Sequence, residues 1–369
     1  MGIGGHKWRL LRLGARWDRC VAPIYEASGR GGRVPLLKTL LTNVCRHECA
    51  YCGLRAGRGR APLSWKPEKL VDATLHLWRT GRITGLFLSS SIPGDPDRVV
   101  ERQLDVLRGL RSRGFTGYIH LKLMPGVSRH LISEAVELAD RVGVNLEAPD
   151  PNIFSEICPD KGGFGEAVLK RLSWAVDEVR RARLRAPDAE FGCGRAGVDT
   201  QMVVGAAEDD DLQYLEVVEM LYRRLGLRRV YFSGFEPQPY TPLERRPPCP
   251  KSRVRRLYQA SFLIRDYGIG VDELAQILEG GLLPNVDPKV ALARQTPDLF
   301  PIDLNTATYR EILRIPGIGP VNAKKIVEAR KRSKIRRISD LERILGASLA
   351  RGVLPYVHLE YKPLTSYAP

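Results

Sequence analysis

The sequence lacks any run of about 18 apolar residues, so it predicts no membrane-spanning helix. Its arginine-rich start also lacks the apolar core of about 7 to 15 residues that a secretion signal needs. His6 stands where a myristoylation site after Gly2 would need Ser or Thr. These absences argue against an integral or exported protein, and we expect a cytoplasmic one without a membrane partner.

The chain also lacks regular cysteine spacing and any internal repeat of about 20 to 50 residues. Seven cysteines occur in 369 residues, scattered except for three between positions 45 and 52. Because the cytoplasm is reducing, such a pattern argues against a disulfide framework. It favours metal binding for the group of three and simple burial for Cys20, Cys158 and Cys249.

Acidic residues are too few to balance the basic ones. The net charge is +16 and the pI is about 9.7. Residues 301–369 alone hold 13 Lys and Arg against 6 Asp and Glu. A basic surface of this kind favours polyanionic partners, and the tail is the more basic part.

Strand-like apolar runs alternate with amphipathic helical segments from about Leu36 to Phe235. The helical segments include 97–114 and 128–143, and the strands are expected at 35–43, 85–91, 117–125, 142–149, 199–206 and 228–237. This alternation predicts an α/β fold with a parallel sheet, and six strands are too few for an eightfold barrel. We expect a partial (β/α)6 barrel or an open sheet, with the working residues at the carboxyl ends of the strands.

The expected domains are an N-terminal extension (1–34), the α/β domain (35–237), a Pro-rich connector with one or two helices (238–300), and a small all-α domain (301–369).

The stretch CRHECAYC (45–52) follows the first expected strand directly. A zinc site usually takes four ligands in two separated pairs, and His47 lies inside the loop, so zinc is the weaker interpretation. Three thiolates from Cys45, Cys49 and Cys52 would instead hold an iron–sulfur cluster and leave one iron without a protein ligand, free to bind another molecule.

Cys-x3-Cys-x2-Cys after a first strand, with Tyr51 before the last cysteine, resembles the signature of the radical SAM superfamily. The resemblance implies a [4Fe–4S] cluster and S-adenosylmethionine (SAM). One electron cleaves SAM to a 5′-deoxyadenosyl radical, which abstracts hydrogen from the substrate. It also implies an electron donor such as ferredoxin or flavodoxin, while the protein orients the cofactors.

Further residues at strand ends match places where that superfamily contacts SAM. A serine run stands where the superfamily usually has Gly-Gly-Glu, so only the backbone role carries over, and a plain turn is the alternative. An acidic residue at a strand end is otherwise often a helix cap or an ion-pair partner. The candidate SAM contacts are Tyr51, Ser89, Ser90, Ser91, Asn145, Glu147, Gln201, Gly205 and Ser233.

Cys193 lies in a Gly-rich loop before the fifth expected strand, near the expected mouth of the barrel. It is a candidate for a redox or catalytic role, against simple packing of the loop.

The segment IPGIG (315–319) predicts the hairpin of a helix-hairpin-helix motif, with Asn305 or Thr306 capping the first helix and a second helix over 321–332. Such a hairpin presents backbone N–H groups to a phosphate, and nearby cations add salt-dependent attraction. A helical hairpin with a merely solvated basic face is the alternative. The candidate nucleic-acid contacts are Gly317, Gly319, Lys324, Lys325, Arg330, Arg332 and Lys334.

The two halves together resemble the family of DNA modification or repair radical SAM proteins with a C-terminal helix-hairpin-helix domain, from about Ala22 to Val357. DTQ (199–201) departs slightly from the STQ of that family. The resemblance implies an enzyme acting on a nucleotide in DNA, or less favourably in RNA. A substrate other than nucleic acid, and a nucleic-acid-binding iron–sulfur protein without radical chemistry, stay open.

Overall fold

The computed structural model describes residues 24–29, 32–59 and 61–361. The first 23 residues of the expected N-terminal extension and the last eight of the chain lie outside this part. The chain divides into two compact units. The first contains the residues up to Asp209 together with Leu221–Pro250, and the second contains Asp210–Met220 together with the residues from Lys251 onward.

The first unit is built on one seven-stranded sheet in which the strands follow each other in chain order. Six strands, β2 to β7, are parallel, and β1 pairs with β2 in the antiparallel sense. The strands are β1 (Ile24–Gly29), β2 (Gly32–Leu40), β3 (Gly85–Ser89), β4 (Tyr118–Leu123), β5 (Arg141–Val144), β6 (Gly197–Val204) and β7 (Arg229–Gly234).

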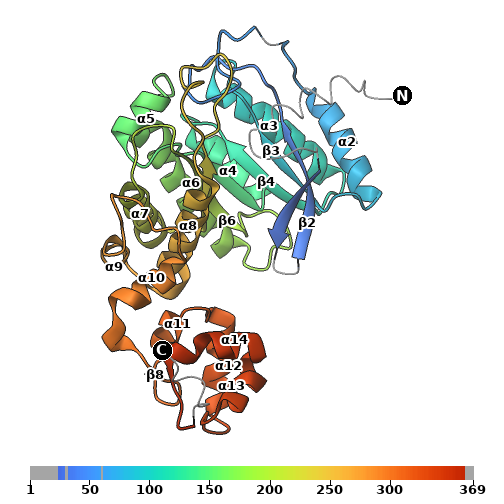
Figure 1. Ribbon diagram of the computed structural model, residues 1–369. Coiled ribbons are helices and arrows are strands. Elements are labelled where there is room, and N and C mark those ends of the chain that lie inside the picture. Colours follow the sequence, from blue (N-terminus) through green and yellow to red (C-terminus); the bar gives the residue numbers. More distant parts are fainter. Residues whose placement is uncertain (1–23, 30–31, 60, 362–369) are drawn as a thin grey trace. The chain divides into compact units, whose positions relative to one another are not determined.

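The six parallel strands confirm the predicted α/β partial barrel, and the sheet curls as a half-barrel (Figure 1). Strand β1 was not predicted, because its residues fell in the expected extension. It forms through a short antiparallel hairpin in which Ile24 pairs with Leu37.

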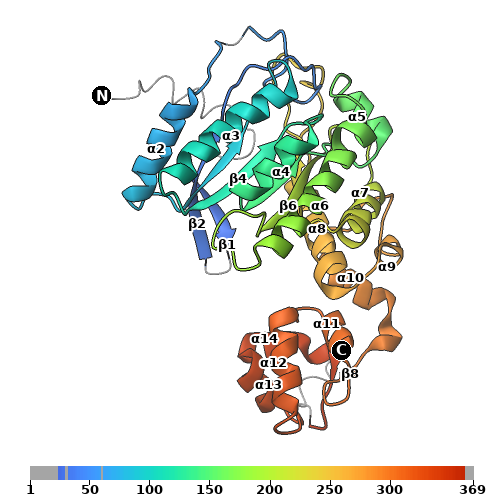
Figure 2. The same ribbon diagram turned by 180° about the vertical axis from the view of Figure 1, so that it is seen from behind.

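Helices α2, α3, α4 and α6 cover one face of the sheet, as Figure 2 shows from behind. Between the strands lie α2 (Pro67–Arg79), α3 (Pro96–Ser112), α4 (Arg129–Leu138), α5 (Pro151–Ile157), the π-helical turn η1 (Phe164–Leu169) and α6 (Lys170–Arg185). Helix α3 begins where Asp95 accepts a hydrogen bond from the Asp97 N–H and Pro96 fixes the first turn. The segment expected to be helical over 128–143 ends at Leu138, because Arg141 already belongs to β5.

The second unit contains helices from the connector as well as from the tail. The connector holds α8 (Lys251–Phe262), η3 (Leu263–Tyr267), α9 (Val271–Ala275), α10 (Pro288–Gln295) and η4 (Pro297–Leu299), more helical turns than expected. Helix α7 (Asp211–Glu219), capped by Asp210, joins the same unit, and η2 (Met220–Leu225) follows it.

The tail forms the expected hairpin of helices with its own apolar core, which includes Ile312, Ile318, Ile326 and Leu341. Its elements are β8 (Ile302–Asp303), α11 (Tyr309–Arg314), α12 (Pro320–Arg330), α13 (Ile338–Leu345), α14 (Ala347–Val353), η5 (Leu354–Tyr356) and β9 (Val357–His358).

The predicted cap of the first tail helix, Asn305 or Thr306, is wrong. Thr308 is the N-cap, because its hydroxyl accepts a hydrogen bond from the Glu311 N–H while the Glu311 carboxylate accepts one from the Thr308 N–H. Asn305 instead binds the backbone of Ile335 and so ties the start of the motif to the segment before α13.

Among the helices of the described residues, none is long and apolar enough to cross a membrane.

Candidate active site

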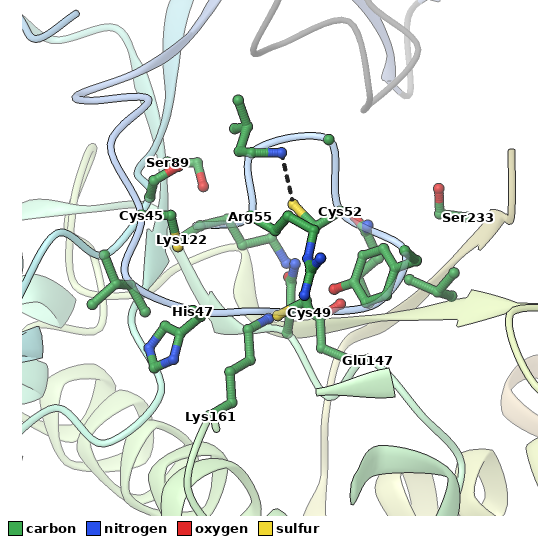
Figure 3. Close-up of a pocket in the computed structure, with 18 of the residues that line it drawn as sticks. Cys45, His47, Cys49, Cys52, Arg55, Ser89, Lys122, Glu147, Lys161 and Ser233 are labelled. Carbon is green, nitrogen blue, oxygen red and sulfur yellow. Dashed lines mark hydrogen bonds and ion pairs between the residues drawn. The ribbon is translucent and has the colours of Figure 1, made fainter. Parts of the chain in front are cut away.

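The three neighbouring cysteines line one cavity at the carboxyl ends of the parallel strands, as Figure 3 shows. The cavity has a volume of about 210 Å³. Cys45, Cys49 and Cys52 come from the loop after β2, and Cys49 is buried. The parallel sheet places this loop beside the ends of β3 to β7, so distant parts of the sequence meet there.

Asp160 fastens the cysteine loop to the segment after α5. Its carboxylate accepts a hydrogen bond from the Glu48 N–H, at 3.1 Å, and lies 3.3 Å from His47 Nδ1. Burial lowers the pKa of His47, although Asp160 opposes this shift. Asp160 therefore holds the loop in place through the Glu48 N–H, and the buried His47 ring lies beside it, a contact for which the sequence offered no signal.

Cys158, expected to be simply buried, packs against Cys49. A hydrogen bond from Cys158 and the nearby Lys161 lower the pKa of the Cys49 thiol to about 7 despite its burial. Burial raises the pKa of Cys52 to about 12. The Cys49 and Cys52 thiols thus differ in acidity, and Cys49 is the one of these two that is more readily present as a thiolate.

Glu147 and Lys161 form an ion pair beside Cys49. The Lys161 ammonium lies 2.6 Å from the Glu147 carboxylate, and the two side chains are 13% and 6% exposed. Glu147 adopts a positive φ of 66°, an uncommon conformation for a residue with a side chain. Backbone hydrogen bonds to Gln201 and Val203 of β6 hold it there, which aims the carboxylate towards Lys161.

The structure brings most of the predicted SAM contacts together. Ser89, Ser90, Ser91, Asn145, Glu147, Gln201 and Ser233 line the cavity, as does Tyr51. Gly205 is the exception. It lies outside the cavity lining, and a side chain at its Cα would meet Cys249.

The position predicted for Cys193 at the mouth of the barrel is wrong. The loop that holds it precedes β6 and therefore lies at the amino edge of the sheet, opposite the cysteine loop. There its N–H donates a hydrogen bond to the Glu137 carbonyl at the end of α4. Its φ of 50° serves this tight loop.

Several residues of the cavity were missed from the sequence because they lie within strands or distant loops. These are Arg55, Lys122, Lys161, Glu236 and Gln238. Side chains alternate between the two faces of a strand, so the pattern along β4 could have predicted that Lys122 faces the inside of the barrel.

The tail presents a separate basic surface around its hairpin. Gly317 has a φ of 84°, which favours glycine, and Gly319 caps α12. Lys324, Lys325, Arg332 and Lys334 are exposed. Arg330 is different, since its guanidinium donates to the carbonyls of Leu304 and Ala307, so it braces the motif and is not free for a phosphate.

Comparisons with known proteins match the tail to one family and most of the chain to other relatives. The helix-hairpin-helix motif matches residues 300–348. The chain is 25% identical over 277 residues to 7,8-didemethyl-8-hydroxy-5-deazariboflavin synthase of Methanosarcina mazei, covering 70% of this chain and 73% of that protein. It is also 24% identical to an uncharacterised protein of Methanocaldococcus jannaschii, over 57% of this chain and 51% of that one.

Similar solved structures include the FeFe-hydrogenase maturase HydG of Carboxydothermus hydrogenoformans, with a TM-score of 0.49 and 15% identity, covering 62% of this chain and 50% of that one. Methylornithine synthase (PylB) has a TM-score of 0.47 and 15% identity, covering 72% and 70%.

The structure places the three-cysteine loop at the carboxyl edge of six parallel strands. In this loop and its place in the sheet, the chain resembles the radical SAM superfamily. The loop lines a cavity, as the [4Fe–4S] cluster and SAM that the resemblance implies would require.

The donor set of the cysteine loop fits a cluster better than a single ion. Within residues 24–29, 32–59 and 61–361, no three His, Cys, Asp or Glu side chains converge on the one point that a zinc ion needs. A cubane is larger and separates its thiolate ligands, as a loop with three cysteines around a cavity allows. Lys161 adds a positive charge beside Cys49, which favours thiolate ligands.

Proposed function

We propose that this radical SAM enzyme modifies or repairs a nucleotide in DNA. The observation that carries the proposal is the helix-hairpin-helix motif of residues 300–348, with its exposed lysines beside a glycine hairpin. Such a motif binds the phosphate backbone without reading sequence, so it would deliver the polymer and leave recognition of the target to the barrel.

In the barrel, Cys45, Cys49 and Cys52 would hold the cluster. The backbone of Ser89–Ser91, with Asn145, would orient SAM. When bound, the two cofactors supply a radical that abstracts hydrogen, and the electron would come from a small donor such as ferredoxin or flavodoxin. The protein's own part is to fix the cysteine loop through Asp160 and to line the reaction space.

The size of the cavity implies that only a small part of a polymer can enter. Its volume is about 210 Å³, and the cofactors take part of the surrounding space. A base within a duplex would have to leave the stack to reach it, as in other enzymes that act on bases. A damaged, mismatched or single-stranded site would therefore be favoured.

Mass spectrometry of nucleosides from cells with and without this protein tests the proposal. We expect a modified or damaged deoxynucleoside whose amount differs between the two, and no change among tRNA nucleosides. A change confined to tRNA would move the substrate to RNA. No change in either pool would contradict a nucleic-acid substrate.

A small-molecule substrate is the second candidate. The relative that is 25% identical over 70% of this chain is named for the synthesis of a small molecule, 7,8-didemethyl-8-hydroxy-5-deazariboflavin. Under this alternative, the tail would bind a partner and not the substrate. Comparison of small-molecule extracts from the same cells distinguishes the two candidates.

A further inference from the structure

The inside of the half-barrel holds a buried group of charged side chains below the cavity. The Asp199 carboxylate of β6 lies 2.5 Å from Lys122 Nζ and 2.5 Å from His120 Nε2, both on β4. Asp199 is fully buried, and the two partners are about as inaccessible, at 5% and 4%. Charged residues are rarely buried without a reason, so this group calls for a function.

The sheet is built to allow this contact across a whole strand. Gly143 of β5 pairs with Asp199 in register and stands between β4 and β6. A Cβ on Gly143 would overlap the Asp199 carboxylate. The missing side chain lets the carboxylate cross β5 and reach Lys122, so the arrangement belongs to the architecture of the barrel.

The positive charge in this interior exceeds the negative charge. The positive charge of Arg141 of β5 also lowers the pKa of Asp199. The Arg141 guanidinium donates hydrogen bonds to the Ala196 carbonyl and to the Tyr231 hydroxyl. No described carboxylate lies within ion-pair distance of Arg141, so two fixed cations face one carboxylate. Burial lowers the pKa of His120, although Asp199 opposes this shift, and His120 and Lys122 hold the pKa of Asp199 low despite its burial.

Lys122 is the member of this group that also lines the cavity. The same cavity is lined by Asn145, directly after β5, by Gln201 of β6 and by Ser233 of β7, and all three side chains can donate hydrogen bonds. A lysine that lines the cavity together with neutral donors, and that belongs to a buried group with an excess of positive charge, is suited to a carboxylate or a phosphate.

We propose that the floor of the cavity binds an oxyanion, a carboxylate or a phosphate, with Lys122 as its charged contact. Asp199 and His120 are positioning residues that hold the Lys122 side chain in place. The proposal rests on the cavity being the reaction site. The anion belongs either to the substrate or to the methionine part of SAM, since both chemistries suit an ammonium.

Binding measurements on the anaerobically reconstituted full chain test the proposal. All variants carry Lys324→Gln and Lys325→Gln, so that phosphate bound at the hairpin does not obscure the cavity. Calorimetry then measures the affinity for SAM and, with SAM present, the affinities for inorganic phosphate and acetate. Lys122→Met is compared with Lys122→Arg and with Lys69→Met, an exposed lysine of α2.

Lys122→Met is expected to weaken one of these ligands by about ten- to hundredfold, since it removes a charged hydrogen bond. Lys122→Arg should retain part of the affinity, and Lys69→Met should change nothing. Loss of SAM affinity assigns the anion to SAM, whereas loss of phosphate or acetate affinity assigns it to the substrate. Unchanged affinity for all three ligands would overturn the proposal.

Two further controls keep the result interpretable. Lys122→Met removes the nearest cation from the buried Asp199 carboxylate, which can destabilise the fold. The double variant Lys122→Met/Asp199→Asn removes both charges, and its thermal melting shows whether the fold is retained. It must show the same loss of anion binding. Binding of acetate but not of phosphate at this site would support the oxyanion site and count against a nucleotide substrate. The oxyanion proposal and the nucleotide proposal can therefore fail separately.

Discussion

In the barrel, Lys161 and Lys122 are largely buried, each with a carboxylate at 2.5 to 2.6 Å, whereas Lys324 and Lys325 of the tail are exposed. Buried ion pairs fix a group in one position, and their strength hardly depends on salt. Exposed lysines attract phosphates from any direction, and salt screens them. This difference fits the proposal that the barrel positions small groups with its cations and that the tail binds a polymer with its own.

Replacing Cys45, Cys49 and Cys52 together by Ala should have the largest effect on the barrel. We expect complete loss of the visible iron–sulfur absorbance and of SAM cleavage after anaerobic reconstitution, because no other described residues supply the ligand set. Cys193→Ala is the control, since Cys193 lies at the opposite edge of the sheet, and it should retain both properties. SAM cleavage that survived the triple replacement would contradict the assignment of the site.

Gly143→Ala should disrupt the barrel without touching the cysteines. The new Cβ would overlap the Asp199 carboxylate, so we expect the free energy of unfolding to fall by about 4 kcal/mol or more. Chemical denaturation measures this change. Gly165→Ala is a matched control, because a Cβ there meets open space, and its effect should stay below about 1 kcal/mol.

Lys289 should make the stability of the second unit depend on pH. Burial lowers the pKa of this lysine, which lies over the Tyr267 ring and donates to the Ile318 carbonyl, to about 7. In the unfolded chain its pKa is about 10.4, so between these values the unfolded state binds more protons and stability rises with pH. Below pH 7 the full cost of burying the charge is present.

The rise in the free energy of unfolding should amount to at most about 4 kcal/mol between pH 7 and 10. Melting curves over pH 6 to 9 on the full chain measure most of it. Lys289→Met should flatten the pH dependence of the transition that reports on the tail. An equally steep dependence in the variant would assign the effect to other groups.

Neutralising Lys324 and Lys325 by Gln should have the smallest effect, about a tenfold loss of affinity for duplex DNA. The slope of log affinity against log salt should fall by about 2, since each phosphate contact contributes about 1. Lys66→Gln/Lys69→Gln, an exposed pair at the start of α2, is the control. An unchanged slope in the Lys324 and Lys325 variant would remove the hairpin from the DNA-binding surface.

The sequence predicted the parallel strands and the cysteine site because both depend on local patterns. Apolar runs mark the strands, and three closely spaced thiols mark the loop. It also predicted the hairpin, whose glycines and following lysines lie close together along the chain.

Contacts between distant segments were beyond the sequence. The Glu147–Lys161 pair depends on a loop closing over a strand end, and the Lys122–Asp199 pair depends on Gly143 in the strand between them. Cys193 was misplaced because its loop was assigned to the wrong edge of the sheet. Arg330 was misassigned because its charge is used inside the motif.

The most direct test of radical chemistry coupled to DNA is the release of 5′-deoxyadenosine. It is measured on the anaerobically reconstituted protein with dithionite and SAM, once with duplex DNA and once without. We expect that 5′-deoxyadenosine forms, that DNA increases its amount, and that Lys324→Gln/Lys325→Gln weakens only the increase. A protein with an intact cluster that forms no 5′-deoxyadenosine under either condition would contradict the account.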